Sequence, residues 1–182
     1  PRDVVLVDEA YVDFGGESAV PLIAGYPNLL VVQTLSKFAA LAGMRIGIAM
    51  GQPQLIEGLN RIKDSFNSYT VNTLSNAAGA AALRDAEYIR EQTAHICAIR
   101  HRTAAALGEM GCEVLPSATN FLMFRAPGVT GEALYTGLRD RGILVRHFRS
   151  PGRIAPYVRM SMGTDGQMEA VCAAIREIIE EV

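Results

Sequence analysis

A lysine and an arginine eight residues apart are the side chains of this chain with the clearest chemical potential. Lys37 stands among small, polar and apolar neighbours in the stretch 34–45. An apolar, crowded setting favours the uncharged amine of a lysine, which condenses with an aldehyde to form a Schiff base. Arg45 keeps its charge and can hold a phosphate or a carboxylate through two parallel hydrogen bonds. Thr34 and Ser36 add hydroxyl groups that can donate to the same anion.

The same stretch also fits a loop lysine followed by a surface arginine, so the surrounding elements must decide between the two interpretations. Residues 4–7 form a continuous apolar run, which is typical of a parallel strand buried on both faces. Asp8 and Tyr11 follow at its C-terminal end. Ligands of open parallel sheets bind outside the carboxyl ends of the strands, so both residues point to a site. The alternatives are a loop-capping role for Asp8 and ordinary packing for Tyr11.

Two further apolar runs extend this sheet. Residues 29–33 predict a second buried strand, which ends at the polar group of Thr34, Ser36 and Lys37, and residues 46–50 predict a third strand. Such strands on short connections predict an α/β sheet. A buried parallel strand needs neighbours on both sides, and this chain opens directly on one. We therefore expect the sequence to be the later part of a longer protein.

The patterns that follow divide the chain into two parts. Helical spacing or composition predicts helices over residues 53–63, 72–83, 85–110 and 130–141, with a last helix capped by Thr164 or Asp165. Gly111 and Gly142 are expected to end the third and fourth of these helices. Short strands at residues 113–116, 121–124 and 157–162, and one that residues 143–145 lead into, predict a small α+β unit. We place the boundary near residue 84, which gives domains 1–84 and 85–182 joined by the long helix. The basic side chains of that helix, Arg100 among them, are expected on a solvated face.

Composition limits the possible partners. The 182 residues carry a formal net charge of -2, which gives no reason to expect nucleic acid or an anionic membrane as a partner. No apolar run approaches the roughly 20 residues that span a bilayer. The cysteines and histidines lack the spacing of metal ligands, so we expect no metal site. Three widely spaced cysteines fit reduced thiols in a cytoplasmic protein.

Several motifs in a fixed order resemble the fold-type I pyridoxal-phosphate aminotransferases, and most closely their histidinol-phosphate aminotransferase branch. The motifs are Asp8-x-Ala10-Tyr11, Ser36-Lys37 with Arg45, Pro116-Ser117-x-x-Asn120-Phe121, and the stretches 142–148 and 158–164. Each motif is weak alone, but their order and spacing together are specific. The resemblance covers nearly the whole chain and only the second part of the family's length. It implies part of a mostly parallel large-domain sheet, followed by a small α+β C-terminal domain.

The resemblance also implies roles for the polar residues of the first part. Lys37 would hold the cofactor, pyridoxal 5'-phosphate, as a Schiff base and would later act as a general base. Asp8 would pair with the pyridine nitrogen, and Tyr11 would donate a hydrogen bond to the phenolic oxygen of the ring. The cofactor phosphate would be held by Arg45, Ser36 and Thr34.

In the second part, the resemblance implies a substrate site. Arg159 matches the family's arginine for the substrate anion, and Arg146 matches a second cation near the substrate phosphate. Strand periodicity turns Arg159 away from Val158 and Met160, so it needs an anion or solvent. Other arginines lie close to Arg146, and at least some of them are surface charge. Asn120 matches the family motif, and it also fits a turn residue before a strand.

The implied reaction transfers an amino group from histidinol phosphate to 2-oxoglutarate in histidine biosynthesis. The family builds its site across a homodimer, and its earlier part supplies a glycine-rich helix start, a ring-stacking aromatic residue and an asparagine. Threonine-phosphate decarboxylase or another class I or II aminotransferase is an alternative. An alternative of another class is a non-catalytic fragment that serves as a structural or interaction module, with apolar surface exposed at its sheet edge.

Overall fold

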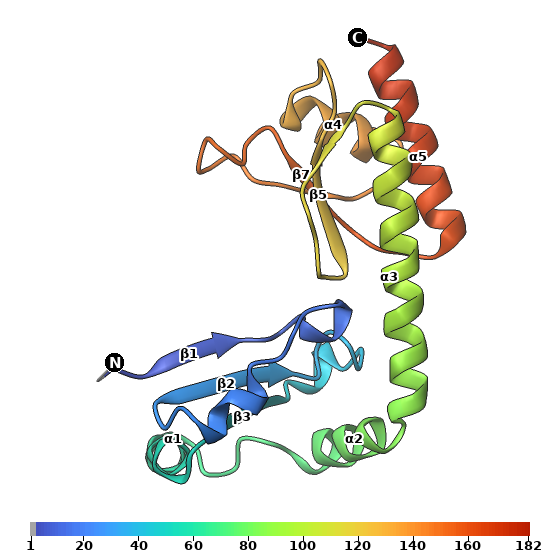
Figure 1. Cartoon of the computed structure of the whole chain (residues 1–182). Coiled ribbons are helices and arrows are strands. Elements are labelled where there is room, and N and C mark those ends of the chain that lie inside the picture. Colours follow the sequence, from blue (N-terminus) through green and yellow to red (C-terminus); the bar gives the residue numbers. More distant parts are fainter. Residues whose placement is uncertain (1–2) are drawn as a thin grey trace. The chain divides into compact units, whose positions relative to one another are not determined.

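The structure is a computed structural model that describes residues 3–182 and divides into two compact units (Figure 1). The first unit extends to Thr93 and the second runs from Ala94 to Val182. The units part inside the long helix α3 (Ala86–Glu109), whereas the boundary expected near residue 84 precedes that helix. Each unit is described below by itself.

The first unit is built on a three-stranded sheet in the order β1-β2-β3. β1 (Val5–Asp8) runs parallel to β2 (Leu29–Thr34), and β3 (Gly47–Gly51) runs antiparallel to β2. Asp8 pairs with Val32, and Thr34 pairs with Gly47. The C-terminal ends of β1 and β2 and the start of β3 therefore lie at one end of the sheet, which we call the polar sheet end (residues 8–11, 34–37 and 45–46). The unit is mixed α/β, and the sheet is only partly parallel.

The prediction that residues 4–7 are buried on both faces is wrong for this chain. β1 starts at Val5, and the side chains of Val4, Val5 and Leu6 are 57%, 44% and 57% exposed. β1 is an edge strand whose only described neighbour is β2, so its apolar faces are uncovered. The central strand β2 does have the expected burial, with Leu29, Leu30 and Val31 all below 7% exposure.

Short helices surround this sheet. The connections contain the 3-10 helices η1 (Val12–Phe14), η2 (Val20–Ala24) and η3 (Ala42–Met44). α1 (Pro53–Phe66) and α2 (Thr73–Arg84) lie below the sheet in Figure 1. The prediction of both helices is confirmed, but the apolar face of α1 is only partly covered, because Leu59 and Ile62 remain exposed.

The second unit has a four-stranded antiparallel sheet in the order β4-β5-β7-β6. Its strands are β4 (Glu113–Val114), β5 (Phe121–Arg125), β6 (Arg146–His147) and β7 (Val158–Ser161). α4 (Gly131–Asp140) and α5 (Asp165–Glu180) accompany the sheet, together with the C-terminal part of α3. The predicted α+β character of this part is confirmed.

One apolar core holds the second unit together. It includes Ile99, Leu107, Leu122, Phe124, Leu134, Leu138, Val158 and Ile175, all 2% exposed or less. Gly111 and Gly142 have φ angles of 79° and 76° just after α3 and α4, where the sequence predicts helix stops. Thr164, one of the two expected cap residues, caps α5 through a reciprocal capping box with Gln167.

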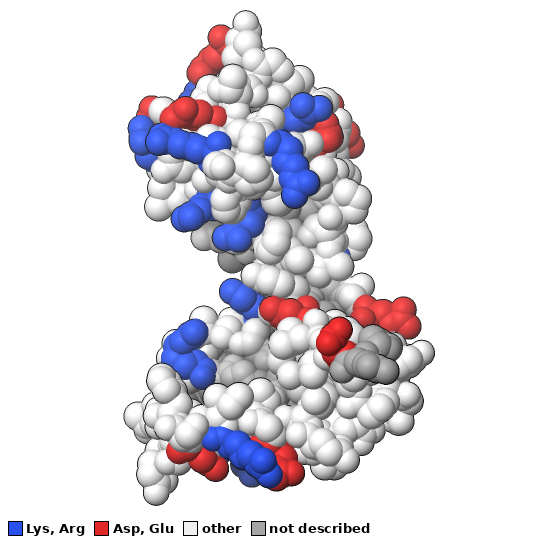
Figure 2. All heavy atoms as spheres, turned by 90° about the vertical axis from the view of Figure 1, so that its left-hand side faces the viewer, with Lys and Arg blue, Asp and Glu red and all other residues white. Residues whose placement is uncertain are grey.

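None of the described helices combines the length and the apolar character needed to cross a membrane. Across residues 3–182, no group of three or more His, Cys, Asp and Glu side chains is arranged to hold a metal ion. Figure 2 shows basic and acidic side chains interspersed on the face that it draws of each unit.

Candidate functional site

The polar sheet end collects the predicted site residues of the first unit. Asp8 ends β1, and Tyr11 follows after a tight turn. Lys37 lies three residues after the end of β2, and Arg45 two residues before the start of β3. Because β3 runs antiparallel to β2, Arg45 returns to the sheet end that Lys37 leaves. Strand direction therefore groups these side chains, although they are distant in sequence.

The connection between β2 and β3 is anchored on both sides. The Leu35 N–H donates to the Ile46 carbonyl, and the Leu41 N–H donates to the Leu35 carbonyl. α2 packs closely against this connection at Gly79, where an added Cβ would lie 2.8 Å from Ile46 Cδ1 and 3.3 Å from Leu35 Cδ1. A larger residue at position 79 would have to displace the ends of the Ile46 and Leu35 side chains, so α2 packs directly against the connection that carries Lys37.

Lys37 contacts the aromatic ring of Tyr11. Its Nζ lies 5.4 Å from the ring centroid, within the range of a cation–π interaction. Both residues are half-buried. The contact joins the segment that follows β1 to the segment that follows β2. It therefore holds the Lys37 amine at the polar sheet end.

The hydroxyl groups of Thr34 and Ser36 lie next to one another. Thr34 Oγ1 donates to the Ile46 carbonyl at 3.0 Å and accepts a hydrogen bond from the Ser36 N–H at 3.1 Å. The Ser36 hydroxyl lies 2.9 Å from Thr34 Oγ1. Thr34 has one hydroxyl proton, which lies within reach of both the Ile46 carbonyl and the Ser36 oxygen. When Thr34 donates to the Ser36 oxygen, the Ser36 proton can be donated to an anion.

Arg45 is exposed and has a strained backbone. Its φ and ψ angles of 56° and 44° are left-handed, a conformation that costs a residue with a Cβ about 1–2 kcal/mol. Its Nη1 donates to the Ala42 carbonyl at 2.9 Å, and no carboxylate of the described residues forms an ion pair with it. Arg45 thus presents an uncompensated charge at the same sheet end as Ser36 and Lys37, where a bound anion would neutralise it.

Asp8 combines the capping role with an open carboxylate. Its Oδ1 accepts a hydrogen bond from the Ala10 N–H at 3.0 Å, and the side chain is exposed. One such bond leaves most of the lone pairs of a carboxylate available to a second donor. Asp8 can therefore cap the turn that follows β1 and still bind a ligand group, so the two roles predicted for it do not exclude one another.

Glu9 is a buried carboxylate at the polar sheet end that the sequence pattern does not single out. It follows Asp8 directly but is 6% exposed, one of the few buried charged side chains described. Burial opposes its ionisation, but hydrogen bonds from Gln33, the Ala19 N–H and Ser18 outweigh that effect and lower the pKa of Glu9. The sequence signal for Glu9 is weak, because Glu9 is simply one more polar residue, with Asp8 and Tyr11, after the apolar run 4–7.

In the second unit, two arginines face one another across neighbouring strands. Arg146 of β6 pairs in register with Arg159 of β7. The Arg146 Cζ lies 5.5 Å from the centroid of the Phe148 ring, and the Arg159 Cζ lies 5.8 Å from the same centroid. Arg159 also lies 5.1 Å from the centroid of the Phe121 ring.

These two charges have no counter-ion among the described residues, whereas nearby Arg149 pairs with Glu132 at 2.8 Å. Like charges directly opposite one another on a sheet are destabilising, so the pair favours binding of an anion. Arg159 is half-buried while Val158 and Met160 are 0% and 3% exposed, which confirms the predicted alternation.

Asn120 lies in a turn that a buried arginine organises. The prediction that Arg100 belongs to a solvated face is wrong, because Arg100 is 5% exposed and its Nη1 donates to the Thr119 carbonyl at 2.7 Å. Ser117 Oγ donates to the Phe121 carbonyl across the same turn at 2.7 Å. The backbone of Asn120 accepts from the Met162 N–H, so Asn120 joins β5 to the residue after β7.

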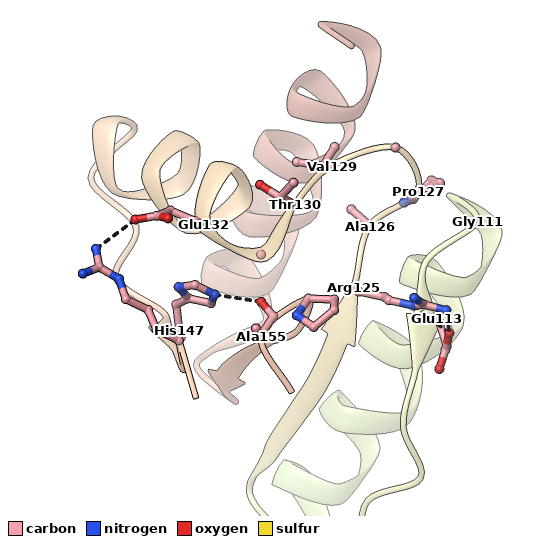
Figure 3. Close-up of a pocket in the computed structure, with 14 residues that line it drawn as sticks. Gly111, Glu113, Arg125, Ala126, Pro127, Val129, Thr130, Glu132, His147 and Ala155 are labelled. Carbon is pink, nitrogen blue, oxygen red and sulfur yellow. Dashed lines mark hydrogen bonds and ion pairs between the residues drawn. The ribbon is translucent and has the colours of Figure 1, made fainter. Parts of the chain in front are cut away.

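A hollow of about 990 Å³ on the second unit is separate from these residues (Figure 3). Its polar groups satisfy one another, since Arg125 pairs with Glu113 and His147 Nε2 donates to the Ala155 carbonyl at 2.8 Å. Its described lining includes neither Arg146, Arg159 nor Asn120. The anion-binding candidates of the second unit therefore lie outside this hollow.

The two sets of residues suit different tasks. The polar sheet end has an amine at Lys37, a carboxylate at Asp8, and anion donors at Ser36 and Arg45. An aldehyde that carries a phosphate and a basic nitrogen fits this set of groups. The pair of Arg146 and Arg159 fits the anionic group of a second molecule.

Comparison with known proteins agrees with this chemistry. The sequence matches the family described as aminotransferase class I and II over residues 3–175. It is 52% identical over 175 residues to histidinol-phosphate aminotransferase 2 of Thiobacillus denitrificans, covering 96% of this chain and 49% of that protein. It is 51% identical over 179 residues to histidinol-phosphate aminotransferase of Aromatoleum aromaticum, covering 98% of this chain and 50% of that protein.

A solved structure has the same fold. The histidinol-phosphate aminotransferase of Sinorhizobium meliloti, in complex with pyridoxal-5'-phosphate, superposes with a TM-score of 0.85 at 29% identity. The match covers 98% of this chain and 49% of that one. The chain thus spans about half the length of the curated relatives that it matches.

Proposed function

This chain belongs to the aminotransferase class I and II family, and from that premise we propose that it forms part of a pyridoxal-phosphate-dependent aminotransferase. We propose histidinol phosphate and 2-oxoglutarate as the substrates, which would place the enzyme in histidine biosynthesis. The names of relatives about 50% identical to this chain support that choice. We assign the first unit to the C-terminal part of the large cofactor-binding domain, and the second unit to the small C-terminal domain.

One observation carries the proposal. The amine of Lys37 lies against the ring of Tyr11, at a sheet end shared with an open carboxylate on Asp8 and an uncompensated cation on Arg45. A structural lysine does not require an exposed arginine with a strained backbone at the same sheet end. The combination supports binding of a phosphorylated aldehyde that Lys37 holds covalently.

Each residue of the polar sheet end has a proposed task in that reaction. When bound, pyridoxal phosphate supplies an aldehyde that condenses with amines and a ring that accepts the electrons left by a departing proton. Asp8 would accept a hydrogen bond from the protonated ring nitrogen, and the Tyr11 hydroxyl would donate to the ring's phenolic oxygen. The free amine of Lys37 would move the proton between carbon atoms as a general base.

Anion recognition is divided between the units in this proposal. Arg45 and Ser36 would hold the cofactor phosphate, with Thr34 fixing the Ser36 hydroxyl in place. Arg159, with Arg146, would bind the phosphate of histidinol phosphate, and Arg159 would bind a carboxylate of the amino acid or 2-oxo acid. Asn120 would line the substrate site from the turn before β5. A homodimer and a cytoplasmic location complete the proposal, both carried over from the family.

Covalent trapping tests the cofactor assignment. The full-length protein is titrated with pyridoxal 5'-phosphate, reduced with borohydride and digested for peptide mapping. We expect one modified lysine, Lys37, and an equilibrium sedimentation profile of a dimer. A modification confined to another lysine, or none, would refute the cofactor site and favour the interaction-module alternative.

Product analysis separates the two reactions that a phosphate-binding arginine pair supports. The enzyme is supplied with histidinol phosphate and 2-oxoglutarate, and glutamate formation is followed. In parallel, it is supplied with threonine phosphate, and carbon dioxide release is followed. We expect glutamate formation and no carbon dioxide. Carbon dioxide release without glutamate formation would replace our proposal by the decarboxylase alternative.

A further inference from the structure

Glu9 is a buried carboxylate that the proposed reaction does not use. It is 6% exposed, although Asp8 before it is exposed. An unpaired buried carboxylate would cost several kcal/mol, so the burial of Glu9 demands donors around it.

Three donors from two separate segments supply this need. Gln33 Nε2, from the end of β2, donates to Oε2 at 2.9 Å. The Ser18 hydroxyl donates to the same oxygen at 2.8 Å, and the Ala19 N–H donates to Oε1. Ser18 and Ala19 belong to the loop that follows η1 and leads into η2. One carboxylate therefore joins the end of β1, the end of β2 and this loop, and we call this set of hydrogen bonds the junction.

The position of this junction relates it to the cofactor residues. The Glu9 N–H donates to the Val32 carbonyl at 2.8 Å and continues the parallel pairing one residue past β1. Glu9 lies between Asp8 and Tyr11 in the sequence, and Gln33 directly precedes Thr34. The side-chain bond between Glu9 and Gln33 thus ties the backbone that carries Asp8 and Tyr11 to the backbone that leads to Lys37.

We propose that Glu9 is a positioning residue that fixes Asp8 and Tyr11 relative to Lys37 through its bonds to Gln33, Ser18 and Ala19. The inference rests on the proposed cofactor site and adds a residue that does not touch the cofactor. The 5.4 Å contact between Lys37 and the Tyr11 ring is the geometry that this junction maintains. Loss of the junction lets the two strand ends move independently, which costs affinity for any ligand that bridges them.

Exchange of the two bonded side chains provides a sharp test. In Glu9→Gln, the charge is lost and one of the two acceptor oxygens becomes a donor, so Gln33 and Ser18 lose their charge-assisted bonds and Gln33 must turn its own oxygen towards position 9. In the double variant Glu9→Gln/Gln33→Glu, the new carboxylate at position 33 accepts from the new amide at position 9. That amide oxygen still accepts from the Ala19 N–H, and its nitrogen donates to the Ser18 oxygen. The double variant therefore restores the junction with its polarity reversed.

The measured quantity is the dissociation constant of pyridoxal 5'-phosphate for the full-length apoenzyme, followed by its absorbance, with thermal unfolding of each variant alongside. We expect Glu9→Gln to raise this constant about tenfold and the double variant to return within about threefold of the original. Glu17→Gln, an exposed carboxylate in the same loop, should change nothing. Val31→Ala, in the buried middle of β2, should lower stability without changing the constant.

The outcomes separate the two proposals. If the unaltered protein does not bind the cofactor at Lys37, the proposed function fails. If it binds, but Glu9→Gln binds equally well, or the double variant binds no better than Glu9→Gln, the positioning role is overturned. Equal affinity losses in Val31→Ala and Glu9→Gln would reduce Glu9 to a general stabilising residue. Should Glu9→Gln not fold, Ser18→Ala removes one donor only, and an unchanged constant there would also overturn the role.

Discussion

The Nζ atom of Lys37 lies 5.4 Å from the centroid of the Tyr11 ring, so the residues that follow β1 and β2 meet at the polar sheet end. Such a contact contributes about 0.5–1 kcal/mol at an exposed site, enough to bias one lysine rotamer. The contact brings a nucleophilic amine and a phenolic hydroxyl to the same place. It is the geometric basis for assigning the chemistry to this sheet end.

Replacement of Lys37 should abolish turnover while leaving the fold intact. The chain contains two lysines, Lys37 and Lys63, which makes a matched comparison possible. We expect Lys37→Ala to lower kcat by about a thousandfold or more, since both the covalent link and the general base are lost. Lys63→Ala should leave kcat unchanged, because Lys63 only pairs with Asp64 on the surface of α1. Equal kcat values for the two variants would contradict the role of Lys37.

A glycine at position 45 should separate strain from anion binding. Arg45→Gly removes the cation and also relieves a left-handed backbone, so the free energy of unfolding should rise by up to about 1 kcal/mol. Affinity for pyridoxal 5'-phosphate should fall about tenfold or more, because a charge-assisted contact to the phosphate is lost. Chemical denaturation and cofactor titration measure the two effects.

Ala40 offers the control for that experiment, since its φ of 54° is also left-handed. Ala40→Gly relieves similar strain without removing a charge, so stability should rise while cofactor affinity stays the same. Unchanged affinity in Arg45→Gly would exclude Arg45 from the phosphate site.

The arginine pair of the second unit should determine the KM for the phosphorylated substrate. Arg159→Lys keeps the charge but loses the planar fork and its stacking on Phe121 and Phe148, so we expect KM to rise about tenfold. Phe148→Leu should raise KM in the same direction by a smaller factor, because both guanidinium groups lose one aromatic neighbour.

Arg149→Lys is the control for the arginine substitution, because the charge of Arg149 is already paired with Glu132. Steady-state kinetics with histidinol phosphate should give the same KM for Arg149→Lys as for the unaltered enzyme. A rise as large as that of Arg159→Lys would mean that total positive charge, and not the Arg146–Arg159 pair, controls binding.

Acid should weaken the first unit through Glu9. The pKa of Glu9 is lowered in the folded state from 4.5, because its hydrogen bonds outweigh the effect of burial. A carboxylate with a depressed folded pKa contributes stability that is fully present above the unfolded pKa. That stability is lost as the pH falls below about 4.5 and through the folded pKa. Urea denaturation at pH 7 should therefore separate the original protein from Glu9→Gln more widely than at pH 3.

Asp13 works in the opposite direction and must be considered in the same measurement. Asp13 is exposed, but partial desolvation by its surroundings raises its pKa. A hydrogen bond to its own backbone lowers that pKa, and the nearby charge of Glu9 adds to the rise. The ionised form of Asp13 is therefore unfavourable in the folded protein, and its protonation as the pH falls offsets part of the stability lost at Glu9. A stability difference between the original protein and Glu9→Gln that stays constant from pH 7 to pH 3 would contradict the ionised state of Glu9.

The sequence by itself determined the order of the elements and the residues that could do chemistry. Period and composition predicted β2, the helices and their glycine stops, because these depend on local backbone preference and on one apolar face. Asp8, Lys37 and Arg45 stood out because strand ends in open sheets collect ligands. The resemblance of the ordered motifs pointed to the family that the comparison then identified.

Only the tertiary structure decided which of these residues meet and which charges are buried. The antiparallel direction of β3 brings Arg45 back beside Lys37, and the register of β6 on β7 sets Arg146 against Arg159. Glu9 and Arg100 are charged residues that the sequence pattern leaves in solvent, but the structure buries both. Their hydrogen-bond partners come from distant segments, which the pattern does not show. The apolar run of β1 is exposed for the converse reason, since burial depends on neighbouring elements and not on the run itself.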